Sequence, residues 1–397
     1  MASMYALTPR TEDFDVLWPD LKESVERIVA LQDIPRDIWN DCFSYVYRLC
    51  VAVPTPMADQ LYLRTKETLE VHVDGIYEEI CSQRDIVAAY AQKWLVYSKG
   101  ADYVHHLFLY LNKVYIKNRR YRDLGEQVSG SLPLDNLRNS MMEIGEMALD
   151  VWKRLVIGRI RERLIRSILD SIEAERQGDP SAMEAEQARV ALHSLVQTEQ
   201  YKDHEELEFY HEVFETPYLA ESHQFFEKLS ERLLAELSPA EYMPRVLDIQ
   251  KVETYKAERY LYRSSAPKLL NLFRSTMVAQ HVDTLNAVAQ ELVRGERKDD
   301  LKNMYLLLVH VDKGPSKLVA EFEAHVKSQG MDAVRNLPVE NTATAFVESI
   351  LGVHTKYTLF VQEAFGSAMV FTRAMDRALQ ASVNYKGTGK IPRASEY

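Results

Sequence analysis

Glycine and proline are scarce in this sequence, with 14 residues of each among 397. Tight turns and the phosphate-binding loops of doubly wound α/β enzymes draw on glycine, and proline interrupts regular structure. A chain with so few of both residues is expected to form long helices joined by few tight turns. The composition therefore argues against a nucleotide-binding α/β enzyme.

Cysteine is nearly absent, with Cys42, Cys50 and Cys81 as the three examples. An odd and sparse count argues against a disulfide framework and is typical of a reducing compartment. No segment approaches the roughly 18 apolar residues of a membrane span. Residues 1–15 lack the apolar core of a secretory signal. We therefore expect a soluble intracellular protein with no membrane partner.

Basic blocks and catalytic motifs are also missing. The net charge is −11 and no phosphate-neutralising stripe is present, which argues against a nucleic-acid partner. His204 and Glu205 begin a zinc-protease motif, but Glu208 stands where its second histidine is needed. Residues 387–390 (GTGK) lack the upstream glycine of a phosphate loop, and Ile391 follows the lysine. We predict no catalytic residue, no cofactor and no metal site.

Nearly every segment repeats its apolar residues at a helical period, and no strand is predicted. Polar stretches at 121–133 and 264–267 divide about fifteen helices into three blocks of about five. The predicted organisation is an arm (1–13), three helical repeats (14–125, 126–265 and 266–385) and a polar tail (386–397). The predicted helices span residues 14–31, 36–53, 57–82, 85–97, 101–118, 134–157, 158–176, 182–200, 207–237 with a break near Pro217, 240–263, 268–294, 299–310, 315–328, 342–364 and 368–384.

The helices predicted at 36–53 and 101–118 carry more apolar residues than one buried face needs. On the first, one stripe is formed by Ile38, Cys42, Tyr45 and Leu49, and a second by Trp39, Phe43, Val46, Tyr47, Cys50 and Val51. Two interpretations stay open. Either both helices are sandwiched inside a bundle, or each gives one face to the core and one to a partner, as aromatic-rich interface hot spots do.

Four separated stretches resemble the cullin family in register, within a match from about residue 14 to residue 384. They are 208–226 (EFYHEVFETPYLAESHQFF), 257–265 (AERYLYRSS), 304–325 (MYLLLVHVDKGPSKLVAEFEAH) and 346–384, where MDRA stands for the family's LDKA. Within the family, residues 39–43, 98–112 and 142–155 most resemble the elongin-dependent type-two subclass. The resemblance implies an all-α elongated rod of three stacked five-helix cullin repeats, found in the cytoplasm and nucleus.

The resemblance also implies a function. Such a rod is the N-terminal region of a non-catalytic ubiquitin-ligase scaffold. It docks elongin C, bound to elongin B, together with a receptor of the von Hippel–Lindau-box type. In the family a C-terminal domain follows, which binds a RING protein. This sequence ends at Tyr397, so only the substrate-side part is expected here, and the aromatic run at 208–226 is expected to be packing residues rather than an active site.

The resemblance assigns docking to the second and fifth helices of the first repeat and to the N-terminal arm. Thr8 departs from the lysine that the family favours before proline in that arm. The predicted adaptor-binding residues are Leu7, Pro9, Arg10, Trp39, Asn40, Phe43, Tyr47, Val51, Leu107, Tyr110, Leu111, Val114 and Tyr115. The stripe that contains Ile38 and Cys42 is then expected to face the core. The alternatives are a helical-rod tethering or trafficking protein and an all-α enzyme.

Overall fold

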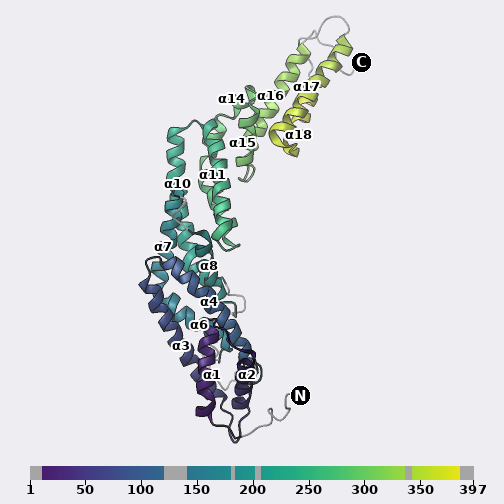
Figure 1. The fold of residues 1–397 in the computed structure, drawn as a ribbon. Helices are drawn as coiled ribbons and strands as arrows, with labels where there is room; N and C mark the ends of the chain where they lie inside the picture. The colour runs from purple at the N-terminus through teal and green to yellow at the C-terminus, as the bar shows by residue number, and fades with distance from the viewer. Residues whose placement is uncertain (1–10, 120–140, 180–183, 202–206, 336–341, 385–397) are drawn as a thin grey trace, which may run out of the picture. The chain divides into compact units, whose positions relative to one another are not determined.

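In the computed structural model the described residues are 11–119, 141–179, 184–201, 207–335 and 342–384. Throughout these ranges the regular structure is helical and contains no strand, as predicted from the sequence. The described helices pack both against neighbours in the chain and against helices further along it (Figure 1). Among the described residues, no helix is long and apolar enough to cross a bilayer.

The chain divides into two compact units. Unit 1 comprises residues 1–218 and 259–262, and unit 2 comprises residues 219–258 and 263–397. The chain crosses between the units three times: inside α10 (Thr216–Glu236), inside α11 (Pro239–Tyr260) and between residues 262 and 263. The three repeat boundaries predicted at 125, 265 and 385 remain a prediction, because compactness alone does not delimit repeats.

Unit 1 begins with four α-helices that match the predicted ones at most ends. Asp13 caps α1 by accepting the N–H of Asp15 at 3.0 Å, and Asp85 caps α4 by accepting the N–H groups of Val87 and Ala88, each at 3.0 Å. The elements of unit 1 before α10 are α1 (Phe14–Val29), α2 (Arg36–Cys50), α3 (Ala58–Ser82), α4 (Ile86–Leu107), the π-helical segment η2 (Leu111–Ile116), α6 (Ile144–Trp152), the π-helical η4 (Lys153–Ile157), α7 (Gly158–Arg176), α8 (Ala185–Gln197), α9 (Glu208–Tyr210) and the π-helical η5 (His211–Glu215).

The break predicted at residues 98–100 is wrong, because α4 runs unbroken through it. A Cβ added to Gly100 would lie 2.4 Å from the carbonyl oxygen of Val29, so this glycine lets α4 and α1 approach closely. The boundary predicted between residues 157 and 158 is also wrong. There η4 joins α6 to α7 as one helix with a local π distortion. Near Pro217 the predicted break is likewise a π segment, η5, that leads directly into α10.

The core of unit 1 is built around Trp152, which is fully buried. Its ring stacks on Tyr97 with centroids 4.8 Å apart and lies 5.3 Å from Trp94. Its Nε1 donates to the hydroxyl of Tyr90 at 3.1 Å, and that hydroxyl lies 2.7 Å from Ser194 Oγ. Every polar atom in this aromatic centre is thus hydrogen-bonded, as buried polar groups require.

The aromatic run at 208–226 belongs to the core, as predicted. In unit 1, Tyr210, Phe214 and Tyr218 are at most 1% exposed, and the rings of Phe214 and Tyr218 stack 5.3 Å apart. In unit 2, Phe226 is fully buried and meets the edge of Phe273 at 5.0 Å. Packing of this kind accounts for the rings without catalysis.

Unit 2 contains most of α10 and α11 and the remaining helices. The helix predicted at 268–294 is instead three α-helices with a 3-10 turn, and the helix predicted at 315–328 extends to Arg335. The elements are α12 (Ser265–Met277), η6 (Ala279–His281), α13 (Val282–Ala287), α14 (Ala289–Arg294), α15 (Lys298–Leu308), α16 (Ser316–Arg335), α17 (Thr342–Phe365) and α18 (Met369–Val383). Phe322 of α16 lies at the centre of their core, 5.6 Å from both Phe365 and Phe371.

A polar cluster joins three elements of unit 2. Glu296, between α14 and α15, accepts hydrogen bonds from the Tyr357 hydroxyl at 2.7 Å and from Lys356 Nζ at 2.6 Å. His325 Nε2 lies 3.0 Å from the same hydroxyl. Tyr357 is 1% exposed, and burial raises its pKa. The side chains of this cluster therefore hydrogen-bond one another, and they link α16 and α17 to the turn before α15.

Candidate adaptor-binding surface

Helix α2 packs against α1, α3, α4 and η2, and lies beside α1 (Figure 1). Its buried residues are Cys42, Val46, Leu49 and Cys50. The buried face lies between the two apolar stripes predicted from the sequence: Cys42 and Leu49 belong to the first stripe, and Val46 and Cys50 belong to the second. Of the stripe expected to face the core, Cys42 and Leu49 are buried, whereas Ile38 and Tyr45 are half-buried.

One flank of α2 stays accessible. Asn40 is exposed, Phe43 is 43% exposed, and Trp39 and Tyr47 are half-buried. Residues four apart on an α-helix differ by only about 40° around its axis, so Trp39, Phe43 and Tyr47 follow one another along this flank. The ring of Tyr47 meets the edge of Tyr110 with centroids 4.8 Å apart at 72°.

Val51 is the C-cap residue of α2 and is half-buried. Its φ of −112° and ψ of 11° lie outside the α-helical region. The helical period that predicts Val51 on the same face as Phe43 therefore does not extend to this residue. Whether Val51 contacts a partner remains a prediction.

The second predicted helix differs more from expectation. Leu107 and Leu111 are fully buried, so their assignment to a docking face is wrong. The helix α4 ends at Leu107, and η2 then follows a π-helical rather than an α-helical period. In an α-helix, Leu107, Leu111 and Val114 would share a face. The π segment breaks that relation, so Val114 is exposed although Leu107 and Leu111 are both buried.

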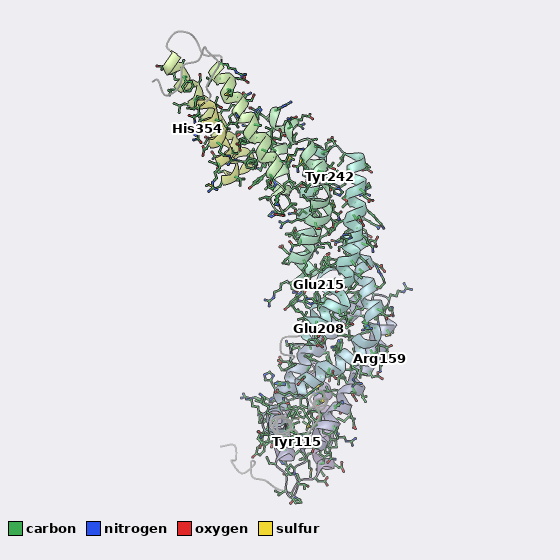
Figure 2. All side chains as sticks on the ribbon, turned by 180° about the vertical axis from the view of Figure 1, so that it is seen from behind. Tyr115, Arg159, Glu208, Glu215, Tyr242 and His354 are labelled. Carbon is green, nitrogen blue, oxygen red and sulfur yellow. The ribbon has the colours of Figure 1, made fainter. Side chains whose placement is uncertain are left out.

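Three of the predicted residues around η2 remain accessible. Val114 is 42% exposed, and Tyr110 and Tyr115 are half-buried. Arg119 donates to the hydroxyl of Tyr115 at 3.2 Å and to Asp59 at 2.7 Å. Figure 2 shows Tyr115 among the N-terminal helices. The accessible residues of α2 and this segment, namely Trp39, Asn40, Phe43, Tyr47, Tyr110, Val114 and Tyr115, are called the α2–η2 surface below.

An ion pair between Arg48 and Glu12, called the Glu12–Arg48 clamp below, lies beside this surface and was not predicted from the sequence. Arg48 of α2 donates through Nε and Nη2 to both carboxylate oxygens of Glu12, at 2.9 and 2.5 Å. The Glu12 side chain is only 8% exposed, and the guanidinium lies 5.8 Å from the ring centre of Tyr45. The predicted arm residues Leu7, Pro9 and Arg10 lie outside the described residues. The 36-residue separation of the pair leaves no local pattern that could have revealed it.

The side chains of the α2–η2 surface carry no charge at neutral pH. Burial raises the pKa of Tyr110 and of Tyr115, so both hydroxyls are protonated at neutral pH. Burial also raises the pKa of Cys50 to about 12, which keeps this thiol beneath the surface unreactive. An aromatic, uncharged patch that is partly covered suits recognition of an apolar protein surface.

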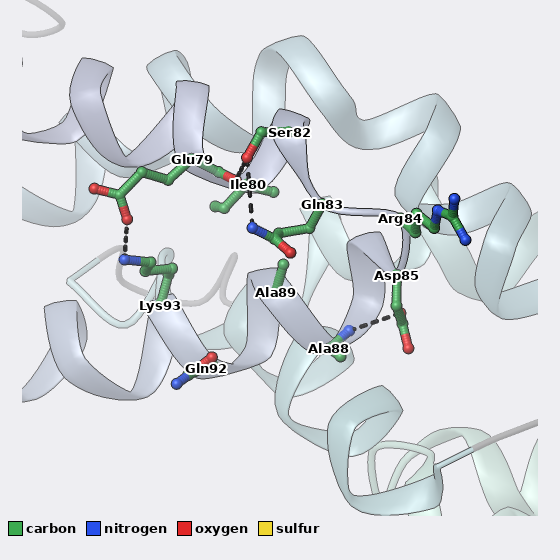
Figure 3. Close-up of a pocket in the computed structure, with 10 residues that line it drawn as sticks. All are labelled: Glu79, Ile80, Ser82, Gln83, Arg84, Asp85, Ala88, Ala89, Gln92 and Lys93. Carbon is green, nitrogen blue, oxygen red and sulfur yellow. Dashed lines mark hydrogen bonds and ion pairs between the residues drawn. The ribbon is translucent and has the colours of Figure 1, made fainter.

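A cavity of about 640 Å³ lies elsewhere in unit 1, where α3 turns into α4. Figure 3 shows the Glu79–Lys93 ion pair at one end and Arg84 and Asp85 at the other. Asp85 is already used as the cap of α4, and Ser82 Oγ donates to the carbonyl of Glu79 at 2.7 Å. None of the ten lining residues is a histidine or cysteine. The described residues also contain no group of three metal-ligating side chains.

Comparison with known proteins identifies what the chain resembles. A family model described as the cullin alpha solenoid domain matches residues 18–397. Cullin-2 of Caenorhabditis elegans is 34% identical over 99% of this chain and 51% of its own length. Cullin-1 of Dictyostelium discoideum is 24% identical over 96% of this chain and 51% of its length, and Cullin-1 of Schizosaccharomyces pombe is 25% identical over 83% and 42%. The chain spans about half the length of the curated relatives it matches.

Proposed function

The chain belongs to the cullin family, and we propose that it is the part of a ubiquitin-ligase scaffold that docks an adaptor and a substrate receptor. The proposed adaptor is elongin C in complex with elongin B, and the proposed receptor is a protein of the von Hippel–Lindau-box type. The role is presentation of a substrate rather than chemistry, so the chain acts without a catalytic residue or cofactor.

The observation that carries this proposal is the α2–η2 surface. It combines exposed apolar and aromatic groups, Phe43 and Val114 above all, with half-buried rings that already pack on one another. Partly pre-packed aromatic residues lose little side-chain entropy on binding, which is why such residues dominate interface energies. The likeness to a protein named Cullin-2 supports the choice of adaptor.

The direct test is titration of the chain with purified elongin B/C, with and without a receptor, in a calorimeter. Adaptors used by other cullins serve as comparison ligands. We expect saturable binding of elongin B/C and no binding of the other adaptors. Equal binding of every adaptor, or of none, would contradict the proposed specificity.

A matched pair of variants locates the contact. Phe43→Ala removes an aromatic side chain from the α2–η2 surface, whereas Tyr255→Ala removes one that is 63% exposed on α11 in unit 2. We expect the first variant to weaken elongin B/C binding and the second to leave it unchanged. An equal effect of both variants would place the contact elsewhere.

The scaffold role has a second test in a reconstituted ligase. Added in excess to a complete cullin ligase, the chain should compete for elongin B/C and lower substrate ubiquitination. It should not by itself accelerate discharge of a ubiquitin-charged conjugating enzyme. Stimulated discharge by the purified chain would refute the non-catalytic role.

A further inference from the structure

Asn112 is a buried polar residue inside the π-helical segment η2, with 1% of its surface exposed. Its Oδ1 accepts the backbone N–H of Ile144, at the start of α6, at 2.9 Å. Its Nδ2 lies 3.2 Å from the carbonyl oxygen of His105 and 3.2 Å from the Nδ1 of the same residue. One side chain thus connects the end of α4, the segment η2 and the first turn of α6.

The orientation of this amide follows from its partners. The N–H of Ile144 can only donate, so the oxygen of Asn112 must face it and the nitrogen must face His105. The nitrogen then donates to the His105 carbonyl and ring, and Nδ1 of that ring acts as an acceptor. The Ile144 N–H is one of the first-turn donors that a helix leaves without an internal partner. Asn112 therefore satisfies a helix end as well as its own amide.

The close approach of α6 is built into the backbone. A Cβ added to Gly145 would lie 2.9 Å from Nδ1 of His105 and 2.7 Å from the hydroxyl of Tyr201. Both distances are shorter than real Cβ atoms show, so a larger residue at position 145 would require the side chains of His105 and Tyr201 to shift away from α6. Glu143, just before α6, adds an ion pair of 3.7 Å to Lys117, which follows η2.

The π register of η2 decides which side chains face outward. Leu111 and Ile116 are five residues apart and both fully buried. In an α-helix, residues five apart point about 140° from each other, so they could not share one buried face. A π-helix has wider turns closed by i→i+5 hydrogen bonds, so residues five apart lie nearer to one face, and both can point inward while Val114 points outward. Loss of the π register would therefore rearrange the part of the α2–η2 surface that η2 contributes.

We propose that Asn112 is a positioning residue of the adaptor-binding surface. By linking His105 to Ile144 it holds η2 in the π register, and so it presents Val114 and Tyr115 without touching the partner. The link to adaptor binding rests on the proposed function, whereas the control of the η2 register is a property of this chain alone.

The test compares Asn112→Ala with Ser194→Ala in the full chain. Ser194 of α8 is also a fully buried polar residue, and its hydroxyl bonds to Tyr90 and to the Ala191 carbonyl rather than to η2. Two quantities are measured on each variant: amide hydrogen exchange within residues 111–116, and elongin B/C affinity. Asn112→Asp is the third variant, because it keeps an acceptor for Ile144 and replaces the donors to His105 by a carboxyl oxygen.

For Asn112→Ala we expect exchange in residues 111–116 at least tenfold faster than in the rest of unit 1, and roughly tenfold weaker adaptor binding. Ser194→Ala should change neither the exchange rate of residues 111–116 nor the adaptor affinity by more than twofold. The effects of Asn112→Asp should lie between those of Ser194→Ala and Asn112→Ala. If Asn112→Ala does not fold, the Asp variant carries the test. Unchanged exchange at η2 in the variants would overturn the inference whatever the adaptor does. Faster exchange with unchanged adaptor affinity would overturn the link to presentation. Wild-type protein that fails to bind elongin B/C would instead overturn the proposed function, while the exchange data still decide the η2 register.

Discussion

The substitution Phe43→Ala gives the sharpest test of the α2–η2 surface, and its size can be worked from the structure. Phe43 is 43% exposed. A phenylalanine side chain presents about 200 Å², so about 85 Å² remain for a partner to cover. At about 25 cal/mol per Å², full coverage contributes about 2 kcal/mol, or roughly thirtyfold in affinity.

The same substitution also costs the free chain some stability, because more than half of the ring is already covered. We expect a loss of about 1–2 kcal/mol in the free energy of unfolding, less than for a fully buried phenylalanine. A domain with at least about 5 kcal/mol of stability would still be more than 99% folded. A thirtyfold loss of affinity could therefore not arise from unfolding.

Tyr47 is a less clean probe than Phe43. Its ring packs edge-on against Tyr110 at 4.8 Å, a contact worth about 0.5–1.5 kcal/mol within the monomer. We therefore expect Tyr47→Ala to lower both stability and affinity. Both variants are measured by urea unfolding and by calorimetric titration with elongin B/C on one preparation. An unchanged affinity of folded Phe43→Ala would refute the assignment of this flank as the docking face.

Three further predictions concern the free chain. Gly100→Ala should destabilise the chain by ~1–3 kcal/mol in urea unfolding, because the new Cβ meets the Val29 backbone. Gly75→Ala is the control: a Cβ there has nothing within 4 Å, so this substitution should stabilise α3 by ~0.5–1 kcal/mol. Equal effects of the two substitutions would refute the close approach of α1 and α4. Burial lowers the pKa of His72, His105, His193, His281 and His310. Below about pH 6.5 the unfolded chain therefore binds more protons than the folded chain, and stability should fall as the pH drops from 7 towards 5. A melting temperature that does not change over this pH range would contradict the prediction. Stacked repeats predict a radius of gyration well above the roughly 21 Å of a compact chain of this length, and a compact value in small-angle scattering would refute that organisation.

The sequence by itself determined the fold class and most helix ends. Scarce glycine and proline and an apolar period near 3.6 are local properties, and they predicted α1, α2, α3, α17 and α18 to within a few residues. The aromatic run at 208–226 could also be assigned to packing, since its rings recur at helical spacing. These features depend on neighbours in the chain, so a linear pattern records them.

Tertiary structure decided where helices stop and which faces stay open. Gly100 looked like a break, because a glycine that permits close packing of two helices has the same sequence signature as one that ends a helix. The π segment η2 cannot be read from an α-helical period, so the sequence could not show that Val114 is exposed whereas Leu107 and Leu111 are buried.

The long-range polar contacts were beyond the sequence as well. The Glu12–Arg48 clamp joins residues 36 apart, and Asn112 meets Ile144 across 32 residues. Neither pair shares a helix face or a local motif, so only the packing of α2, η2 and α6 brings these donors and acceptors together. Amino-acid order determines which faces are apolar, but the register of one packed helix against another determines which of those faces a partner can reach.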